Sequence, residues 1–339
     1  MIRRRVMKRP LIPPTPPASR PRVFPRMRHG LTAGCVAGAL AVSAATALGA
    51  IAGPPVPVYT PGPAVVTPLL AGPRVPARWH NPEPWAGQPA AVLVTTVPTD
   101  AAGDAASIAW FRSSRTQVAL YPGVKNPETT AYPRGPETVP SFARTTLVAT
   151  FNSGFYLKDA RGGFFANGTL FAPMIGGLGT VVGYRDGHID IIRWSGGRRP
   201  GRDVVMARQN LPLLVSGGRV APGVNISDAW GLTLGGVPAV WRSAIGIDRN
   251  GNLLYVAAPH QTAPSLARIL VHVGAVRAME LDINPAWPIL VTFGRPSAGE
   301  PSLFVPNPNQ VATRFLSPNT KDFFAVYLRT TIDVLPLPF

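Results

Sequence analysis

Hydrophobic residues in the second half of the chain alternate mostly with a period of two, which predicts β-strands and not helices. Three of these runs flank tight turns, in which Asn-Gly, Asp-Gly or paired glycines supply the backbone conformation that a hairpin requires. The predicted hairpins are 179–194 around Asp186-Gly187, 211–220 around Gly217-Gly218 and 244–257 around Asn250-Gly251. Short β-rich runs also occur at 91–97, 118–121 and 146–151.

One segment has the helical period instead. Leu266, Ile269, Leu270 and Val273 share a face at i, i+3, i+4 and i+7 spacing. Thr262 and Pro264 are suited to the start of a helix and Gly274 to its end, and residues 278–283 read as a strand directly after it. We therefore predict a mixed, β-dominated α+β fold: a hairpin-rich sheet with packed helices, in a single exported domain over residues 79–339.

The first 78 residues have a different pattern. Residues 1–30 form a basic, Pro- and Arg-rich tail, and residues 31–52 are an uncharged apolar run, long enough to cross a hydrocarbon core of about 30 Å. Residues 53–78 are rich in proline, which favours an extended linker. Because the arginines precede the apolar run, we expect a single-pass membrane protein with its C-terminal domain outside the cytoplasm. Cleavage after Ala52 would give a secreted protein instead.

The charge distribution argues against nucleic acid as a partner. The formal net charge is +17, but nine of the basic residues lie in residues 1–29, where there is no acid. The remaining excess is spread over the rest of the chain without a basic stripe that could follow phosphates. The only cysteine, Cys35, lies in the apolar run, so neither an intrachain disulfide nor a cysteine metal site is expected.

The strand predicted at 278–283 carries the strongest candidate chemistry. Alternation places Glu280, Asp282 and Asn284 on one face, and burying two carboxylates there is costly unless they are paired or used. Residues i and i+2 lie about 6.6–7 Å apart on a strand, a spacing compatible with acid and base groups acting on a glycosidic bond. A solvated face or a structural ion pair would give the same pattern.

Asn284 on this strand is a candidate for substrate binding, and four further residues are candidates for the same role. A strand that ends in Asn152-Ser153-Gly154 can turn sharply and present the Asn152 amide beside the Gly154 backbone, although the same residues also make an ordinary turn. Arg242 opens a strand and could clamp an oxyanion. His260 ends the next strand and could face a pocket. Without a carboxylate or second histidine at ligand spacing, we predict no metal site, and the sequence leaves any cofactor open.

Taken in order, five segments resemble the phosphodiester glycosidase family over roughly residues 110–330. The matching pieces are Asn152-Ser153-Gly154-Phe155, the hairpin Leu214–Arg219, the strand Arg242–Asp248 with its Asn250-Gly251 turn, the helix ending in Gly274-Ala275, and the strand Ala278–Asp282. In the family the last strand usually continues Asp-Gly-Gly-Gly-Ser. Here Asp282 is followed by Ile283-Asn284-Pro285-Ala286-Trp287, which removes the open glycine loop.

The resemblance implies an exported hydrolase that cleaves the bond between a sugar's C1 and a phosphodiester, in cell-envelope glycans or glycolipids. It implies Asp282 as acid, base or nucleophile with Glu280 as its partner, and Arg242 and Asn152 as groups that hold phosphate or sugar. The altered loop keeps an alternative open: a catalytically inactive, membrane-anchored glycan-binding or scaffold protein on the same fold. A domain that matures or inhibits another envelope enzyme is a third possibility, for which the sequence offers no direct sign.

Overall fold

The computed structural model describes residue 63 and residues 78–82, 89–100, 103–231, 236–294 and 299–329. Every described residue lies within one compact unit, Val56–Phe339. The predicted tail 1–30 and apolar segment 31–52 lie outside the described residues, as does the linker 53–78 except for residues 63 and 78. No described helix is both long and apolar enough to cross a membrane.

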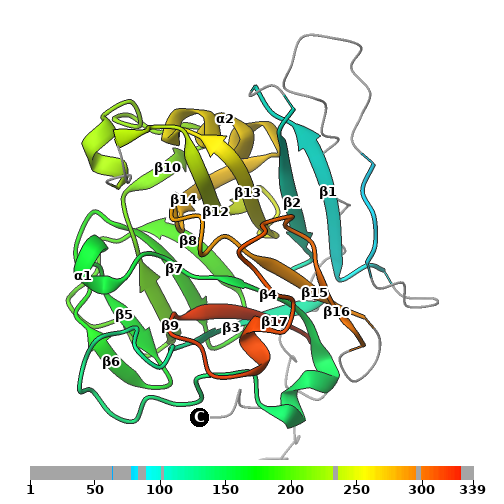
Figure 1. Ribbon diagram of the computed structural model, residues 1–339. Helices are drawn as coiled ribbons and strands as arrows, with labels where there is room; N and C mark the ends of the chain where they lie inside the picture. The colour runs from blue at the N-terminus through cyan, green and yellow to red at the C-terminus, as the bar shows by residue number, and fades with distance from the viewer. Residues whose placement is uncertain are drawn as a thin grey trace, which may run out of the picture. The chain divides into compact units, whose positions relative to one another are not determined.

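Three antiparallel sheets form the framework of the described part (Figure 1). Sheet A has, in spatial order, β1 (Val92–Pro98), β2 (Ala105–Phe111), β13 (Leu253–Gln261), β12 (Val240–Asp248), β14 (Ala275–Glu280), β10 (Leu213–Ser216) and β11 (Arg219–Val220). Sheet B has β16 (Pro301–Leu303), β15 (Leu290–Phe293), β4 (Leu147–Asn152), β17 (Phe323–Leu328) and β3 (Thr116–Tyr121). Sheet C has β6 (Thr169–Ala172), β5 (Phe164–Ala166), β9 (Val204–Gln209), β7 (Gly179–Tyr184) and β8 (Ile189–Arg193).

The three predicted hairpins are confirmed as β7–β8, β10–β11 and β12–β13. Their turns have the expected left-handed glycines, with φ of +83° at Gly187 and +78° at Gly251. These positions favour glycine because a Cβ is strained at positive φ.

The prediction of a mixed α+β fold with packed helices is wrong. In the described part, α2 (Ala263–His272) is the one α-helix longer than a single turn. The others are α1 (Leu157–Ala160) and the 3₁₀ turns η1 (Ser141–Thr146), η2 (Ser227–Trp230) and η4 (Arg314–Leu316). The physical reason is that only one predicted element has the helical period. The other apolar runs are strands, and their side chains are buried between sheets instead of against helices.

The predicted helix itself is confirmed. Thr262 caps α2 by accepting a hydrogen bond from the Ser265 backbone N–H at 3.2 Å, and the Ser265 hydroxyl accepts one from the Thr262 N–H at 2.9 Å. Leu266 and Leu270 are fully buried against the face of sheet A that also carries Val256 and Ala278.

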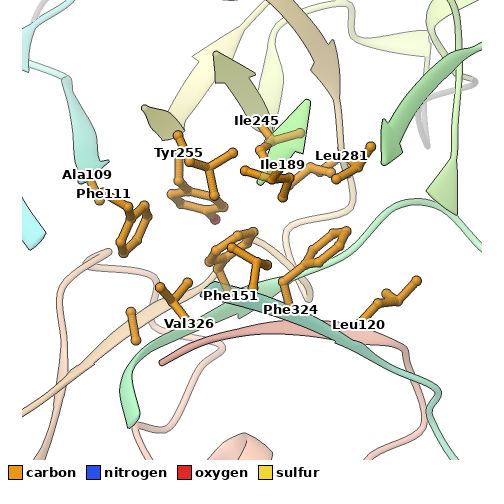
Figure 2. Close-up of a cluster of buried hydrophobic side chains, with 14 of the residues drawn as sticks. Ala109, Phe111, Leu120, Phe151, Ile189, Ile245, Tyr255, Leu281, Phe324 and Val326 are labelled. Atoms are coloured by element: carbon orange, nitrogen blue, oxygen red, sulfur yellow. The ribbon is translucent and has the colours of Figure 1, made fainter. Parts of the chain in front are cut away.

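The main hydrophobic core lies on the other face of sheet A and joins all three sheets (Figure 2). The Phe151 ring of β4 lies 5.0 Å from the Tyr255 ring of sheet A and 5.4 Å from the Phe324 ring of β17. Ile189 of sheet C and Leu281, just past β14, belong to the same core. This packing fixes the ends of β4, β14 and β17 relative to one another, and the candidate site is built from those ends.

Candidate active site

A pocket of about 530 Å³ lies where segments following β4 and β14 meet the segment that precedes β17. Asn152 of β4 pairs with Phe323 of β17, so in this antiparallel pair the end of one strand meets the start of the other. The pocket is lined by Phe155, Tyr156, Asp159, Leu211, Ala229, Gly231, Asp282, Ile283, Asn284, Trp287 and Lys321. It therefore combines aromatic walls with two carboxylates and one ammonium group.

Asp282 is one of the acids that line the pocket, and it is almost completely buried, at 1% exposure. Its Oδ2 lies 2.5 Å from the Lys321 Nζ, and its Oδ1 accepts a hydrogen bond from the Asn284 N–H at 3.0 Å. Burial raises the pKa of the Asp282 carboxyl above its ordinary value, while the Lys321 charge and hydrogen bond oppose that shift.

Glu280 lies two positions earlier but has a different partner. Its Oε1 lies 2.6 Å from an Arg242 guanidinium nitrogen, and its Oε2 has no hydrogen-bond partner among the described residues. Burial raises the Glu280 pKa to about 7, even though Arg242 lowers it. Glu280 does not line the pocket, so the structure does not bring the two predicted carboxylates together on one cavity.

Arg242 is also buried and engaged within the protein. Besides Glu280, its guanidinium donates to the backbone carbonyls of Gln261 at 2.7 Å and of Trp230 at 3.3 Å. It does not line the pocket. The role in holding phosphate that the resemblance implies for Arg242 stays a prediction, without a contact to the pocket that would support it.

Asn152 connects the end of β4 to sheet A. Its side-chain oxygen accepts from the Tyr255 hydroxyl at 2.8 Å and from the Ile289 N–H at 3.2 Å. Its amide nitrogen donates to the Ser243 hydroxyl at 3.0 Å, and that hydroxyl in turn accepts from the Asp282 N–H at 3.2 Å. Asn152 thus positions the backbone of Asp282 through Ser243, and its predicted contact with substrate stays a prediction.

Glycine at position 154 is favoured by a close approach, not by an unusual φ. A Cβ at this position would lie 3.0 Å from the Asn210 side-chain oxygen. Asn210 accepts from the Phe155 N–H at 3.3 Å and donates to the carbonyls of Glu280 at 2.7 Å and Leu281 at 2.9 Å. It therefore ties the turn after β4 to the end of β14, which carries Asp282.

The remaining two candidates lie in different places. Asn284 lines the pocket, and its side-chain oxygen accepts from the Ala286 N–H at 2.9 Å. His260 lies near the end of β13, away from the pocket lining, with an exposed side chain whose Nδ1 is 2.8 Å from an Asp104 carboxylate oxygen. Within the described ranges, no group of three or more His, Cys, Asp or Glu residues is arranged to hold a metal ion.

Sequence reasoning missed the residue that faces Asp282 from the other strand. Lys321 is one of only four lysines in the chain and lies two positions before the apolar strand β17, a place where a charged side chain is unusual. Asp322 follows it and is also buried, where its carboxylate pairs with Arg208 Nε at 2.8 Å and accepts from the Asn126 amide. A charged Lys-Asp pair beside a buried strand is the signal that could have identified this segment.

Comparison with known proteins supports the predicted resemblance. Residues 145–282 match the model of the phosphodiester glycosidase family. This range includes Asn152, Arg242, Glu280 and Asp282 and ends before Trp287 and Lys321. No curated protein matches the chain.

Solved structures are also similar to this chain, among them the following two. One is the zebrafish N-acetylglucosamine-1-phosphodiester alpha-N-acetylglucosaminidase catalytic domain auto-inhibited by its pro-peptide, at 16% identity and a TM-score of 0.45, covering 80% of this chain and 96% of that one. The other is a hypothetical protein from Synechocystis, at 14% identity and a TM-score of 0.43, covering 70% of this chain. This chain spans 62% of the length of the Synechocystis protein.

Proposed function

We propose that this chain is an extracytoplasmic hydrolase that cleaves the bond between a sugar's C1 and a phosphodiester in a cell-envelope glycan or glycolipid. The observation that carries the proposal is the buried Asp282–Lys321 pair in an aromatic-walled pocket of about 530 Å³. The match of residues 145–282 to the phosphodiester glycosidase family supports the same chemistry.

The charges in the pocket suit this reaction. When the C1–O bond breaks, its electron pair goes to the phosphate oxygen, and the departing phosphate gains negative charge. A fixed cation in a water-poor site stabilises charge that develops in this way. Lys321 is the ammonium that lines the pocket, so it takes the phosphate-binding role in this proposal.

Asp282 is the residue placed to act at the sugar carbon. As a carboxylate it can attack C1 directly or remove a proton from the water that does so. Burial raises its pKa, which makes the ionised form a stronger base than an ordinary aspartate. Asp159 is the other acid that lines the pocket, and it is the candidate for the second carboxylate of a glycosidase. Glu280 pairs with Arg242 and does not line the pocket, so it has no direct role at the sugar in this proposal.

Sugar release from an α-linked N-acetylglucosamine 1-phosphodiester tests the proposal. The full-length chain should release the sugar, and Asp282→Asn should lower kcat by at least about 100-fold, as expected for loss of a positioned acid or base. Asp100→Asn is the matched control, because Asp100 is an exposed acid paired with Arg268 and does not line the pocket. Equal activity in wild type and Asp282→Asn would rule out the assigned role.

The second candidate function is glycan binding without catalysis. It is favoured by the absence of Glu280 from the pocket lining, which keeps the two carboxylates predicted for catalysis apart. In that case neither the wild type nor Asp282→Asn would release sugar. Calorimetry would show that both bind the phosphodiester equally well.

A further inference from the structure

Lys321 is held between two aromatic rings. Its Nζ lies 4.7 Å from the Tyr156 ring centroid and 5.1 Å from the Trp287 ring centroid. The two rings meet edge to face, with centroids 6.0 Å apart. Lys321 is 2% exposed, so its ammonium group contacts the aromatic faces and Asp282 more than it contacts solvent.

Such contacts matter for lysine in particular. An ammonium on a flexible four-carbon chain has no preferred direction of its own, whereas aromatic faces attract a cation and do so more strongly when water is excluded. The rings therefore restrict where the charge can lie. Tyr156 follows β4 and Trp287 follows β14, so the two rings reach Lys321 from different strand ends.

The loop that carries Trp287, residues 284–288, is itself fixed by a second segment. Asn307 donates to the Pro285 carbonyl at 2.8 Å and to the Pro288 carbonyl at 2.9 Å. Gln310 donates to the Ala286 carbonyl at 2.6 Å.

Arg314 completes the support. Its guanidinium donates to the Ala286 carbonyl at 3.2 Å, and its Cζ lies 4.7 Å from the Trp287 ring centroid. The loop between Asn284 and Pro288 is thus held by side chains from residues 307–314, and the Trp287 ring has little freedom to leave Lys321.

We propose that Tyr156 and Trp287 are positioning residues that hold Lys321 as the pocket's anion-binding group, with residues 307–314 as the support of Trp287. The Tyr156 and Trp287 rings around Lys321 form an aromatic clamp. The role of this clamp in catalysis rests on the proposed function, but the binding of an anion by Lys321 does not. Ile283–Trp287 replaces the glycine-rich loop of the resembled family, so in this chain that stretch carries a tryptophan whose loop is held by residues 307–314.

NMR of the lysine side chains can test the clamp even if the protein has no enzymatic activity. The chain has four lysines, Lys8, Lys125, Lys158 and Lys321, so ¹³C-lysine labelling of the full-length protein gives few signals, which single Lys→Arg changes assign. Ring currents should shift the Lys321 side-chain signal away from an exposed lysine. Lys158 provides an internal reporter, because its Nζ lies 5.2 Å from the Tyr156 centroid on the exposed side.

Two variants separate the rings. Trp287→Leu should move the Lys321 signal toward the position of an exposed lysine and leave Lys158 unchanged, whereas Tyr156→Leu should move both. Trp287→Phe should retain most of the shift, because a ring face remains. Phe142→Leu, at an aromatic residue that is 62% exposed and outside the pocket lining, should move neither signal. An unshifted Lys321 signal in wild type, or one that Trp287→Leu leaves in place, overturns the clamp.

Anion binding gives the functional readout. Inorganic phosphate should perturb the Lys321 signal in wild type, and Trp287→Leu should weaken its Kd by about 10-fold, as for loss of a desolvated cation–π contact. Trp287→Phe should recover most of the affinity, which a purely space-filling role would not explain because leucine also fills space. Unchanged phosphate affinity in Trp287→Leu contradicts the proposal.

Turnover then separates the two proposals. If the protein releases sugar, Trp287→Leu should raise KM for the phosphodiester by about 10-fold and lower kcat less, and Trp287→Phe should restore KM. If it releases none, the proposed function fails while the NMR and phosphate results still decide the clamp. Should Trp287→Leu fail to fold, Gln310→Ala removes one support of the loop, and it should move the Lys321 signal in the same direction; an unmoved signal counts against the clamp.

Discussion

Asp282 and Glu280 are two positions apart on one chain segment, yet each is buried against a different cation. Asp282 faces Lys321 in the pocket, and Glu280 faces Arg242 away from it. Burial alone would raise the pKa of both carboxyls, and each cation opposes that rise. The two carboxylates therefore differ in their surroundings: Asp282 lines the pocket, whereas Glu280 is paired inside sheet A.

The Asp282–Lys321 pair predicts a particular pH dependence. If ionised Asp282 is required, kcat/KM should fall as pH drops through a pKa above the ordinary aspartate value of 3.8, because burial disfavours the charged form. Lys321→Met removes the opposing charge, so the acidic limb of the profile should move to higher pH. The pH profile of kcat/KM measures this, with the Asp282 ¹³C carboxyl shift as a substitute where residual activity is too low. A limb that stays in place in Lys321→Met would show that the pair does not control Asp282.

At the scale of the elements, the Arg242–Glu280 pair connects two neighbouring strands of sheet A. Arg242 lies on β12 and Glu280 at the end of β14, which pairs with β12 at Ala244. Both side chains are buried, at 4% and 0% exposure. A buried ion pair contributes little when it replaces well-packed apolar residues, but removing one partner leaves a charge without compensation.

We therefore expect Arg242→Met to lower the free energy of unfolding by about 3–5 kcal/mol. The raised Glu280 pKa, about 7 in the native protein, contributes stability that is present below the unfolded value of 4.5 and is lost as pH rises through 7. Arg242→Met raises the Glu280 pKa further, so the loss of unfolding free energy in this variant should be larger at pH 8 than at pH 5. Urea unfolding at both pH values measures the difference. Arg242→Met combined with Glu280→Leu should recover most of the loss, and a double variant as unstable as the single one would contradict the argument.

The elements also show how far the sequence predicts this protein. Local signals identified the β7–β8 and β12–β13 hairpins and helix α2, because turn chemistry and capping act within a few residues. They could not assign strands to three sheets, since sheet pairing joins residues as distant as Asn152 and Phe323. The number of packed helices was overestimated for the same reason: a local pattern does not reveal whether a strand's apolar face packs against a helix or another sheet.

The candidate site was also predicted only where a local pattern exists. Alternation along one strand selected Asp282 and Asn284, which line the pocket, together with Glu280, which does not. Lys321 was missed because its contact with Asp282 spans 39 positions of sequence. No pattern within either segment encodes that contact, which depends on how β14 and β17 are brought together by the core.

At the scale of the whole molecule, residues 79–339 are proposed to work outside the cytoplasm, and the first 52 residues carry that expectation. The basic residues 1–29 precede the apolar run 31–52, and cationic segments remain on the cytoplasmic side of a bacterial membrane. An envelope substrate is accessible to the pocket only in this orientation, so the proposed function and the proposed location stand together.

An alkaline phosphatase reporter joined to Phe339 should be active in intact bacterial cells, because this enzyme gains activity only after export, where its disulfides form. Deleting residues 31–52 should abolish that activity, while changing a comparable number of residues in the proline-rich stretch 53–78 should not. The mass of the untagged protein then separates anchor from signal: an uncleaved chain of 35.9 kDa should sediment with membranes, whereas cleavage after Ala52 would release a shorter, soluble product. A reporter that is inactive in the complete chain, with the protein present in the cytoplasm, would remove the envelope glycan from the proposed function and leave only the chemistry of the pocket.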